Sequence, residues 1–206
     1  GTAVDGNAAQ FGFVSRLDAN GVVDMEFGNM PGFARAPNIH SIYTDAIYDE
    51  QAERIVVIGA ISVNTPYPRG YAACYLDYGN LAPCPGGFSP TLTFDAGVAV
   101  AFDDLVRQPD GRWLVAGTWK PVDNGPWRTL LMRIGRDLSV DAHDFAAPDG
   151  YIGHSYGDEY DLGYAVALQR SRIVVAGVSK HAGGPDYGYA VSGYQVDRLF
   201  ANGLDP

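Results

Sequence analysis

The stretch GRWLVAGTW (Gly111–Trp119) decides the fold, because it has the apolar content of a buried strand and returns twice along the chain. Its relatives are ERIVVIGAI (Glu53–Ile61) and SRIVVAGVS (Ser171–Ser179). Each copy carries a glycine two residues before its end, and these glycines are Gly59, Gly117 and Gly177. Recurrence at intervals of roughly sixty residues is typical of a repeat protein.

A second marker repeats with the same period. RLDANG (Arg16–Gly21) returns as RLFANG (Arg198–Gly203), about three periods later. Within a unit, VRQPDGRWLVAG (Val106–Gly117) reads as two strands joined by a Pro-Asp-Gly turn, and TLLMRI (Thr129–Ile134) reads as a third strand. SVDAHDF (Ser139–Phe145), like GVVDMEF (Gly21–Phe27) in the first unit, is expected to be the fourth.

Four antiparallel strands per unit is the format of a propeller blade, so the sequence predicts an all-β, beta-propeller-like array of about 3.5 repeats. The expected units form one repeat domain. They comprise a half repeat with third and fourth strands at residues 1–37, repeats at 38–95 and 96–153, and a repeat truncated at its last strand at 154–206.

This arrangement resembles the delta-60 repeat family of bacterial, propeller-like repeats. The resemblance rests on the DGRWLVAG hairpin, on RLDANGVVDMEFG (Arg16–Gly28) and on their spacing, and it covers nearly the whole chain. It implies a fold but no catalytic motif. The second unit departs from the pattern, since YLDYGNLAPCPGG (Tyr75–Gly87) stands where an acidic fourth strand is expected.

Composition removes several classes of function. The 206 residues include 47% hydrophobic residues, enough for a sizeable core, and the formal net charge is -10. Nucleic acid is excluded as a partner because the 14 basic residues supply no clustered positive excess. No apolar run is long enough for a membrane span.

The two cysteines, Cys74 and Cys84, are placed on the third strand of the second unit and just past its turn. A disulfide across this hairpin predicts an oxidising compartment, and therefore a secreted or periplasmic protein. The alternative is a pair of reduced, partly buried thiols.

No cofactor is required by any motif, and no histidine spacing indicates a metal site. The acidic turn DANGVVD offers a weak calcium site through Asp18, Asn20 and Asp24. A hairpin turn with positive backbone angles explains Asn20 and Gly21 equally well.

Aromatic residues in loops are the candidate ligand contacts, because exposed aromatic rings can stack on sugars. Trp113 and Trp119 are assigned to the core between blades. The residues left for carbohydrate binding are Trp127, Tyr67, Tyr151, Tyr156 and His154.

The sequence therefore predicts a binding or scaffold module that uses loops on one face. The alternative is an enzyme, a polysaccharide hydrolase or lyase with carboxylates at a central channel, and no motif decides whether the chain has catalytic activity. A second copy of the chain, or the remainder of a processed precursor, is expected to complete the sheet. The rival expectations are an expression fragment and a half unit that closes a four-bladed ring alone.

Overall fold

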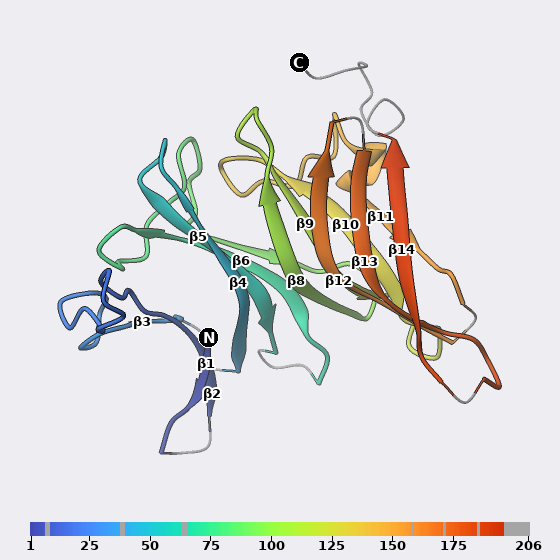
Figure 1. The fold of residues 1–206 in the computed structure, drawn as a ribbon, viewed down its shortest axis with the longest axis horizontal. Coiled ribbons are helices and arrows are strands. Elements are labelled where there is room, and N and C mark those ends of the chain that lie inside the picture. The colour runs from blue at the N-terminus through green and yellow to red at the C-terminus, as the bar shows by residue number, and fades with distance from the viewer. Residues whose placement is uncertain are drawn as a thin grey trace.

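The computed structural model describes residues 1–6, 9–37, 40–62, 66–157, 159–170, 172–184 and 186–195. Their strands form four separate antiparallel sheets (Figure 1). The first sheet contains β1 (Thr2–Val4), β2 (Gln10–Val14) and β3 (Ala34–Arg35). The second contains β4 (Ser41–Asp49), β5 (Arg54–Ile61), β6 (Arg69–Leu76) and β7 (Thr91–Phe94).

The third sheet contains β8 (Ala99–Arg107), β9 (Trp113–Lys120), β10 (Arg128–Ile134) and β11 (Tyr151–His154), with the short helical turn η1 (Ala146–Gly150) before β11. The fourth contains β12 (Tyr160–Gln169), β13 (Arg172–Lys180) and β14 (Gly188–Gln195). Strands follow chain order across each sheet, so each unit is an antiparallel meander.

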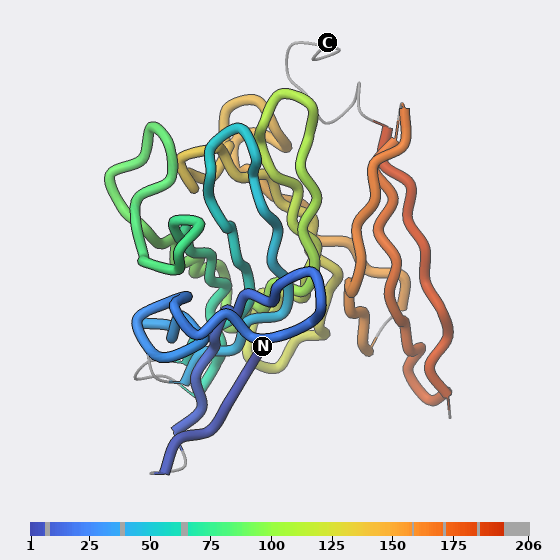
Figure 2. Tube along the Cα trace, turned by 60° about the vertical axis from the view of Figure 1, so that its left-hand side comes forward, coloured from blue at the N-terminus to red at the C-terminus, as the bar shows by residue number. Residues whose placement is uncertain are grey.

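The sheets follow one another face against face, and the first strands β4, β8 and β12 contact one another in succession. The predicted all-β, propeller-like array is confirmed. In both views the β1–β3 sheet and the β12–β14 sheet lie at opposite ends of the array (Figures 1 and 2).

The recurring glycine has a structural reason. Each first strand contains a β-bulge, at Thr44, Asp103 and Tyr164, and the glycine of the second strand lies beside it. A Cβ on Gly59, Gly117 or Gly177 would meet the carbonyl oxygen of the neighbouring first strand at 1.9, 2.2 and 1.8 Å. Only glycine allows this close backbone approach.

Carboxylates beside the bulges join neighbouring sheets. Asp45 Oδ2 accepts a hydrogen bond from the Leu105 backbone N–H at 3.1 Å, and Asp104 Oδ2 accepts one from Val166 N–H at 2.6 Å. In the fourth sheet the corresponding residue is Ala165, which has no carboxylate to offer.

Apolar side chains fill the spaces between consecutive sheets. The cluster between the second and third sheets includes Ile58, Phe102 and Trp113, and Trp119 packs against its edge. The cluster between the third and fourth sheets includes Leu114, Leu131 and Val175. Stacked apolar faces are therefore the main stabilising feature of the array.

The fourth strands differ from the prediction. Residues 21–27 and 139–145 form turns with one bridge each, from Leu17, which follows β2, to Val23 and from Ile134, at the end of β10, to Val140. The fourth strands are instead β3, β7 and β11, which come later in the chain. The predicted segments were wrong because their acidic residues hold a turn and do not line a sheet.

The first sheet has one more strand than the two that the sequence predicted, because β1 pairs with β2 in the position of a second strand. The predicted truncation at the last strand of the final unit lies outside the described residues.

Cys74 and Cys84 form the predicted disulfide, with their Cα atoms 5.5 Å apart. Both residues are buried in the cluster between the second and third sheets. Within the described residues, no helix is long and apolar enough to cross a membrane.

Candidate functional site

Aromatic side chains from three consecutive units lie at one end of the sheets. Tyr67, Trp127 and Tyr187 each lie in the loop between the second and third strands of their unit, and Tyr160 begins β12. The Trp127 and Tyr160 ring centroids are 6.3 Å apart, and those of Tyr160 and Tyr187 are 6.2 Å apart. We call these four residues the aromatic row.

Lysine ammonium groups sit against the rings of this row. Lys120 Nζ lies 6.0 Å from the Tyr67 centroid and 5.8 Å from the Trp127 centroid, so it joins two units. Lys180 Nζ lies 5.8 Å from the Tyr187 centroid and pairs with Glu159 at 3.2 Å. These cation–π contacts place a positive charge beside three of the four rings.

A carboxylate fixes the first member of the row. The Tyr67 hydroxyl donates to Asp123 Oδ1 at 2.6 Å. This hydrogen bond, together with the negative charge of Asp123, raises the pKa of Tyr67. Tyr67 therefore stays neutral at physiological pH.

The backbone positions Trp127 and Tyr160 independently of their rings. The two residues form a parallel bridge, and the Asp161 N–H donates to the Trp127 carbonyl at 3.1 Å. The row is thus built on strand ends, and Trp127 can be truncated without removing a backbone hydrogen bond.

The other predicted ligand contacts lie elsewhere. Tyr151 is on β11 with its ring 5.3 Å from Phe94 and 5.5 Å from Trp119, in the packing between the second and third sheets. His154 and Tyr156 contact each other, with ring centroids 4.4 Å apart. The structure thus brings together Tyr67 and Trp127, and separately His154 and Tyr156.

Sequence reasoning missed Tyr160 and Tyr187. The signal was present, because HAGGPDYG (His181–Gly188) occupies the same loop as Trp127 one unit later. Aligning the loops by the repeating glycine would have placed Tyr187 beside the predicted residues.

The predicted calcium turn is held by its own hydrogen bonds. Asp18 Oδ1 accepts from the Asn20 and Val22 N–H groups, which lowers the pKa of Asp18. Asp24 Oδ2 pairs with Arg16 at 2.7 Å. Among the described residues, no group of three or more His, Cys, Asp or Glu side chains is arranged to hold a metal ion. Calcium binding stays a prediction.

Carboxylates also gather on the inner first strands. Burial raises the pKa of Asp103 to about 6, and burial, together with the neighbouring Asp45, raises the pKa of Asp104. Asp45 and Asp104 accept the backbone hydrogen bonds between sheets described above. Asp103 Oδ2 accepts a long hydrogen bond of 3.5 Å from Thr118 Oγ1.

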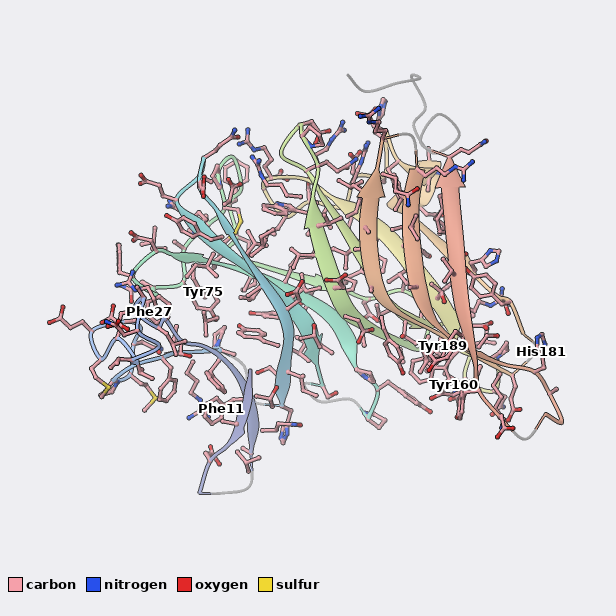
Figure 3. All side chains as sticks on the ribbon, in the orientation of Figure 1. Phe11, Phe27, Tyr75, Tyr160, His181 and Tyr189 are labelled. Atoms are coloured by element: carbon pink, nitrogen blue, oxygen red, sulfur yellow. A yellow bond between two sulfur atoms is a disulfide. The ribbon has the colours of Figure 1, made fainter. Side chains whose placement is uncertain are left out.

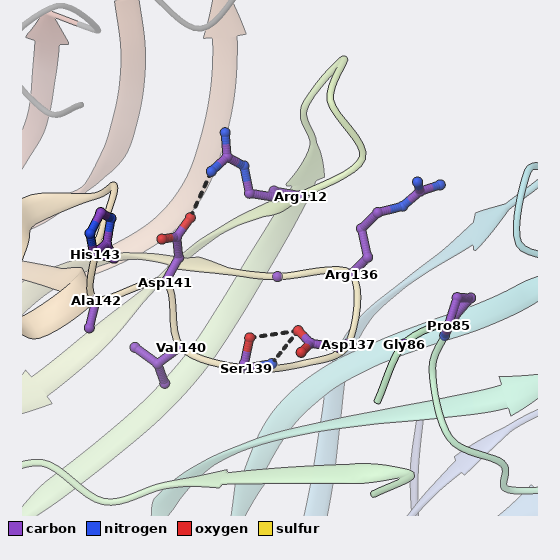
Figure 4. A pocket seen from close by; sticks show the side chains of 11 residues that line it. Pro85, Gly86, Arg112, Arg136, Asp137, Ser139, Val140, Asp141, Ala142 and His143 are labelled. Carbon is purple, nitrogen blue, oxygen red and sulfur yellow. Dashed lines mark hydrogen bonds and ion pairs between the residues drawn. The ribbon is translucent and has the colours of Figure 1, made fainter. Parts of the chain in front are cut away.

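A hollow of about 610 Å³ lies beside the turn after β10 (Figure 4). Its polar groups pair with one another: Arg112 binds Asp141 at 3.0 Å, and Ser139 Oγ donates to Asp137 at 2.6 Å. These contacts hold a turn of the repeat.

Residues 108–143, which contain this turn together with β9 and β10, match a family model described as "Domain of unknown function (DUF5122) beta-propeller". No curated protein matches the chain. The match supports a beta-propeller-like repeat and does not single out the delta-60 family.

Proposed function

We propose that this chain is a binding module of delta-60 type whose ligand surface is the aromatic row. The observation that carries the proposal is the succession of Tyr67, Trp127, Tyr160 and Tyr187 across three units. Binding residues are commonly presented by loops on a rigid scaffold. A row that spans three sheets suits an elongated ligand.

A neutral oligosaccharide fits this row best. The apolar C–H face of a pyranose ring stacks on tyrosine or tryptophan, and its hydroxyl groups can exchange hydrogen bonds with Asp123 and Glu159. The carboxylate of Glu159 beside Lys180, together with a net charge of -10, disfavours an anionic sugar.

A glycan array followed by tryptophan fluorescence titration tests the proposal. Trp127→Ala should weaken binding of a positive neutral glycan by about tenfold or more, because central aromatic residues dominate such interfaces. Tyr78→Ala is the matched control, since Tyr78 is 51% exposed and lies outside the row. The absence of any bound glycan, or equal effects of the two variants, would contradict the proposal.

We place the protein in a secreted or periplasmic compartment. Support comes from the Cys74–Cys84 disulfide, since disulfides persist mainly in oxidising environments. Intact-mass analysis of protein recovered from periplasm and from medium tests this, with the oxidised form expected in one of them.

The alternative function, a polysaccharide hydrolase or lyase, rests on Asp103 and its raised pKa. A half-buried carboxyl whose pKa is raised to about 6 can serve as a general acid. Turnover of a glycan that is lost in Asp103→Asn and retained in Trp127→Tyr would favour the enzyme over the binding module.

A further inference from the structure

Two Asn-Gly sequences among the described residues lie in turns that are held in different ways. Asn20–Gly21 belongs to the turn after β2, and Asn124–Gly125 belongs to the loop between β9 and β10 that carries Trp127. Both asparagines are exposed. Phe27, which follows the first turn, and Tyr160, whose ring lies against Trp127, are toward opposite ends of the array (Figure 3). The two sequences can therefore be compared within one molecule.

The turn that contains Asn20 is fixed by a carboxylate of its own. Asp18 Oδ1 accepts hydrogen bonds from the backbone N–H of Asn20 at 2.8 Å and of Val22 at 2.9 Å. These bonds, together with one from the Asn20 side chain, lower the pKa of Asp18. The Asp18 carbonyl also accepts from the Gly21 N–H at 3.0 Å. Opening this turn therefore breaks hydrogen bonds to an ionised acceptor, which are stronger than bonds between neutral groups.

The backbone of the loop that contains Asn124 makes few hydrogen bonds. Pro121 and Pro126 stand at its two ends and have no N–H to donate. The Gly125 N–H donates to the Val122 carbonyl at 3.0 Å, and within the described residues no other backbone hydrogen bond closes residues 121–126. A single hydrogen bond between neutral groups thus restrains the nitrogen of Gly125.

Side chains add little to this second turn. Asp123 Oδ1 accepts a hydrogen bond from the Tyr67 hydroxyl at 2.6 Å, so this carboxylate is directed toward the second unit, whereas Asp18 binds its own turn. Within the part of the chain that the structure describes, the Asn124 side chain has no hydrogen-bond partner. Because Gly125 has no Cβ, its backbone nitrogen can approach the Asn124 side chain closely once the turn opens.

We propose that Asn124 is a site of spontaneous deamidation in the folded protein, and that Asn20 is protected from the same reaction. The backbone nitrogen of Gly125 forms a bond to Asn124 Cγ, and its proton goes to the side-chain nitrogen, which leaves as ammonia. Water then adds to one of the two carbonyl carbons of the succinimide ring and opens it to aspartate or isoaspartate. Water replaces ammonia in the balance, and no oxidant or reductant is needed.

The product changes the loop that presents Trp127. A new negative charge stands next to Asp123, whose carboxylate binds Tyr67. Isoaspartate also inserts a methylene group into the main chain of the turn that Gly125 closes. The deamidation therefore alters both the charge and the backbone beside the aromatic row. The reaction requires no ligand and does not depend on sugar binding.

Peptide mapping by mass spectrometry, after incubation of the folded protein at neutral and mildly alkaline pH, tests the proposal. The Asn124 peptide should gain the mass difference between water and ammonia about tenfold faster than the Asn20 peptide, because the Asn20 turn must also break its bonds to Asp18. The rate should rise with pH, since the attacking nitrogen must lose its proton. Asn202–Gly203 lies outside the described residues and is mapped as a separate peptide.

Incubation in urea is the internal control, because both Asn-Gly sequences should then react at similar rates. Asp18→Ala removes the side-chain hydrogen bonds from the turn of Asn20, so it should raise the rate at Asn20 toward that at Asn124 and leave Asn124 unchanged. Asn124→Gln should abolish the mass gain of its peptide, since the longer side chain disfavours ring closure. The proposal is overturned if Asn124 stays unmodified in the folded protein while it reacts in urea. It is also overturned if Asn20 reacts as fast as Asn124 in the folded protein, or if Asp18→Ala leaves the rate at Asn20 unchanged.

Discussion

The second and third units secure the same turn by different chemistry. In the third unit, Arg133 on β10 pairs with Asp141 at 2.8 Å, and Asp141 also binds Arg112. The strand register places Cys74 at the position of Arg133, and its disulfide to Cys84 joins β6 to the returning chain. A covalent bond thus replaces an ion pair at one point of the repeat.

The first unit keeps the ion pair in a more exposed form. Arg16 and Asp24 pair at 2.7 Å with side chains 45% and 29% exposed, whereas the Arg133 and Asp141 side chains are 0% and 12% exposed. In both units the arginine lies over a buried phenylalanine, Phe27 or Phe145. Each of these units therefore links its third strand to the following turn, by an ion pair or by a disulfide; we call this link the tether. The burial of a tether determines how much it contributes to the stability of the fold.

Breaking the buried ion pair should have the largest effect. Asp141→Asn removes a carboxylate that pairs with the buried Arg133 guanidinium at 2.8 Å, and this is expected to cost about 3–5 kcal/mol of unfolding free energy. Asp24→Asn, the matched change at the exposed pair, should cost at most about 1 kcal/mol. Urea unfolding of both variants measures the difference. Equal losses of unfolding free energy would contradict the view that burial makes the Arg133–Asp141 pair more stabilising than the Arg16–Asp24 pair.

The second and third units share a glycine beside the β-bulge of the first strand, and substitution of this glycine tests its role. Gly59→Ala and Gly117→Ala should each cost about 3 kcal/mol, because the new Cβ meets a backbone carbonyl oxygen that cannot move without opening the bulge. Gly193→Ala is the control, since a Cβ there meets nothing within 4 Å. Thermal melting should rank both bulge variants well below the control. A tolerated alanine at either bulge would contradict the shared role.

Reducing the disulfide removes the tether of the second unit alone. The cysteines are 10 residues apart in sequence, and closing a loop of this size contributes about 2–3 kcal/mol by restricting the unfolded chain. Urea midpoints with and without reductant, and for Cys74→Ser with Cys84→Ser, should fall by the same amount. If reductant lowers the urea midpoint but the double variant does not, the loss of stability has a cause other than the disulfide.

The smallest expected effect concerns the inner strands, where the second unit has Thr44 and the third has Asp103 at the bulge. The folded-state pKa of Asp103, about 6, lies above the ordinary aspartate value of 3.8 because the side chain is partly buried. The folded state therefore holds this proton more tightly, and stability declines as pH rises from about 4 to about 6.

Asp103→Asn removes the ionisable carboxyl and therefore the loss of stability that accompanies its ionisation. The variant should be more stable than the parent by about 1–2 kcal/mol at pH 7, after allowance for partial exposure, and the difference should vanish near pH 4. Melting curves across this pH range measure it. A constant difference at all pH values would show that the charge of Asp103 is not responsible.

Much of the fold was predictable because strand periodicity and turn residues are local properties. The repeating glycine, the Pro-Asp-Gly turn and the apolar second strands predicted the sheets, and two cysteines near one turn predicted the disulfide. The fourth strands were not predictable in the same way, because the acidic turn at 139–145 resembles an alternating strand until its aspartates are seen to bind Arg112 and Arg133.

The sequence by itself determined the period, the apolar second strands and the nearness of the two cysteines to one turn, since these follow from spacing and composition. Only the tertiary structure decided which loop aromatics meet. Tyr151 and Trp127 lie in comparable sequence contexts, yet packing places one between sheets and the other in the aromatic row. Contacts between side chains of different units depend on how the sheets stack, and the local sequence pattern does not contain that information.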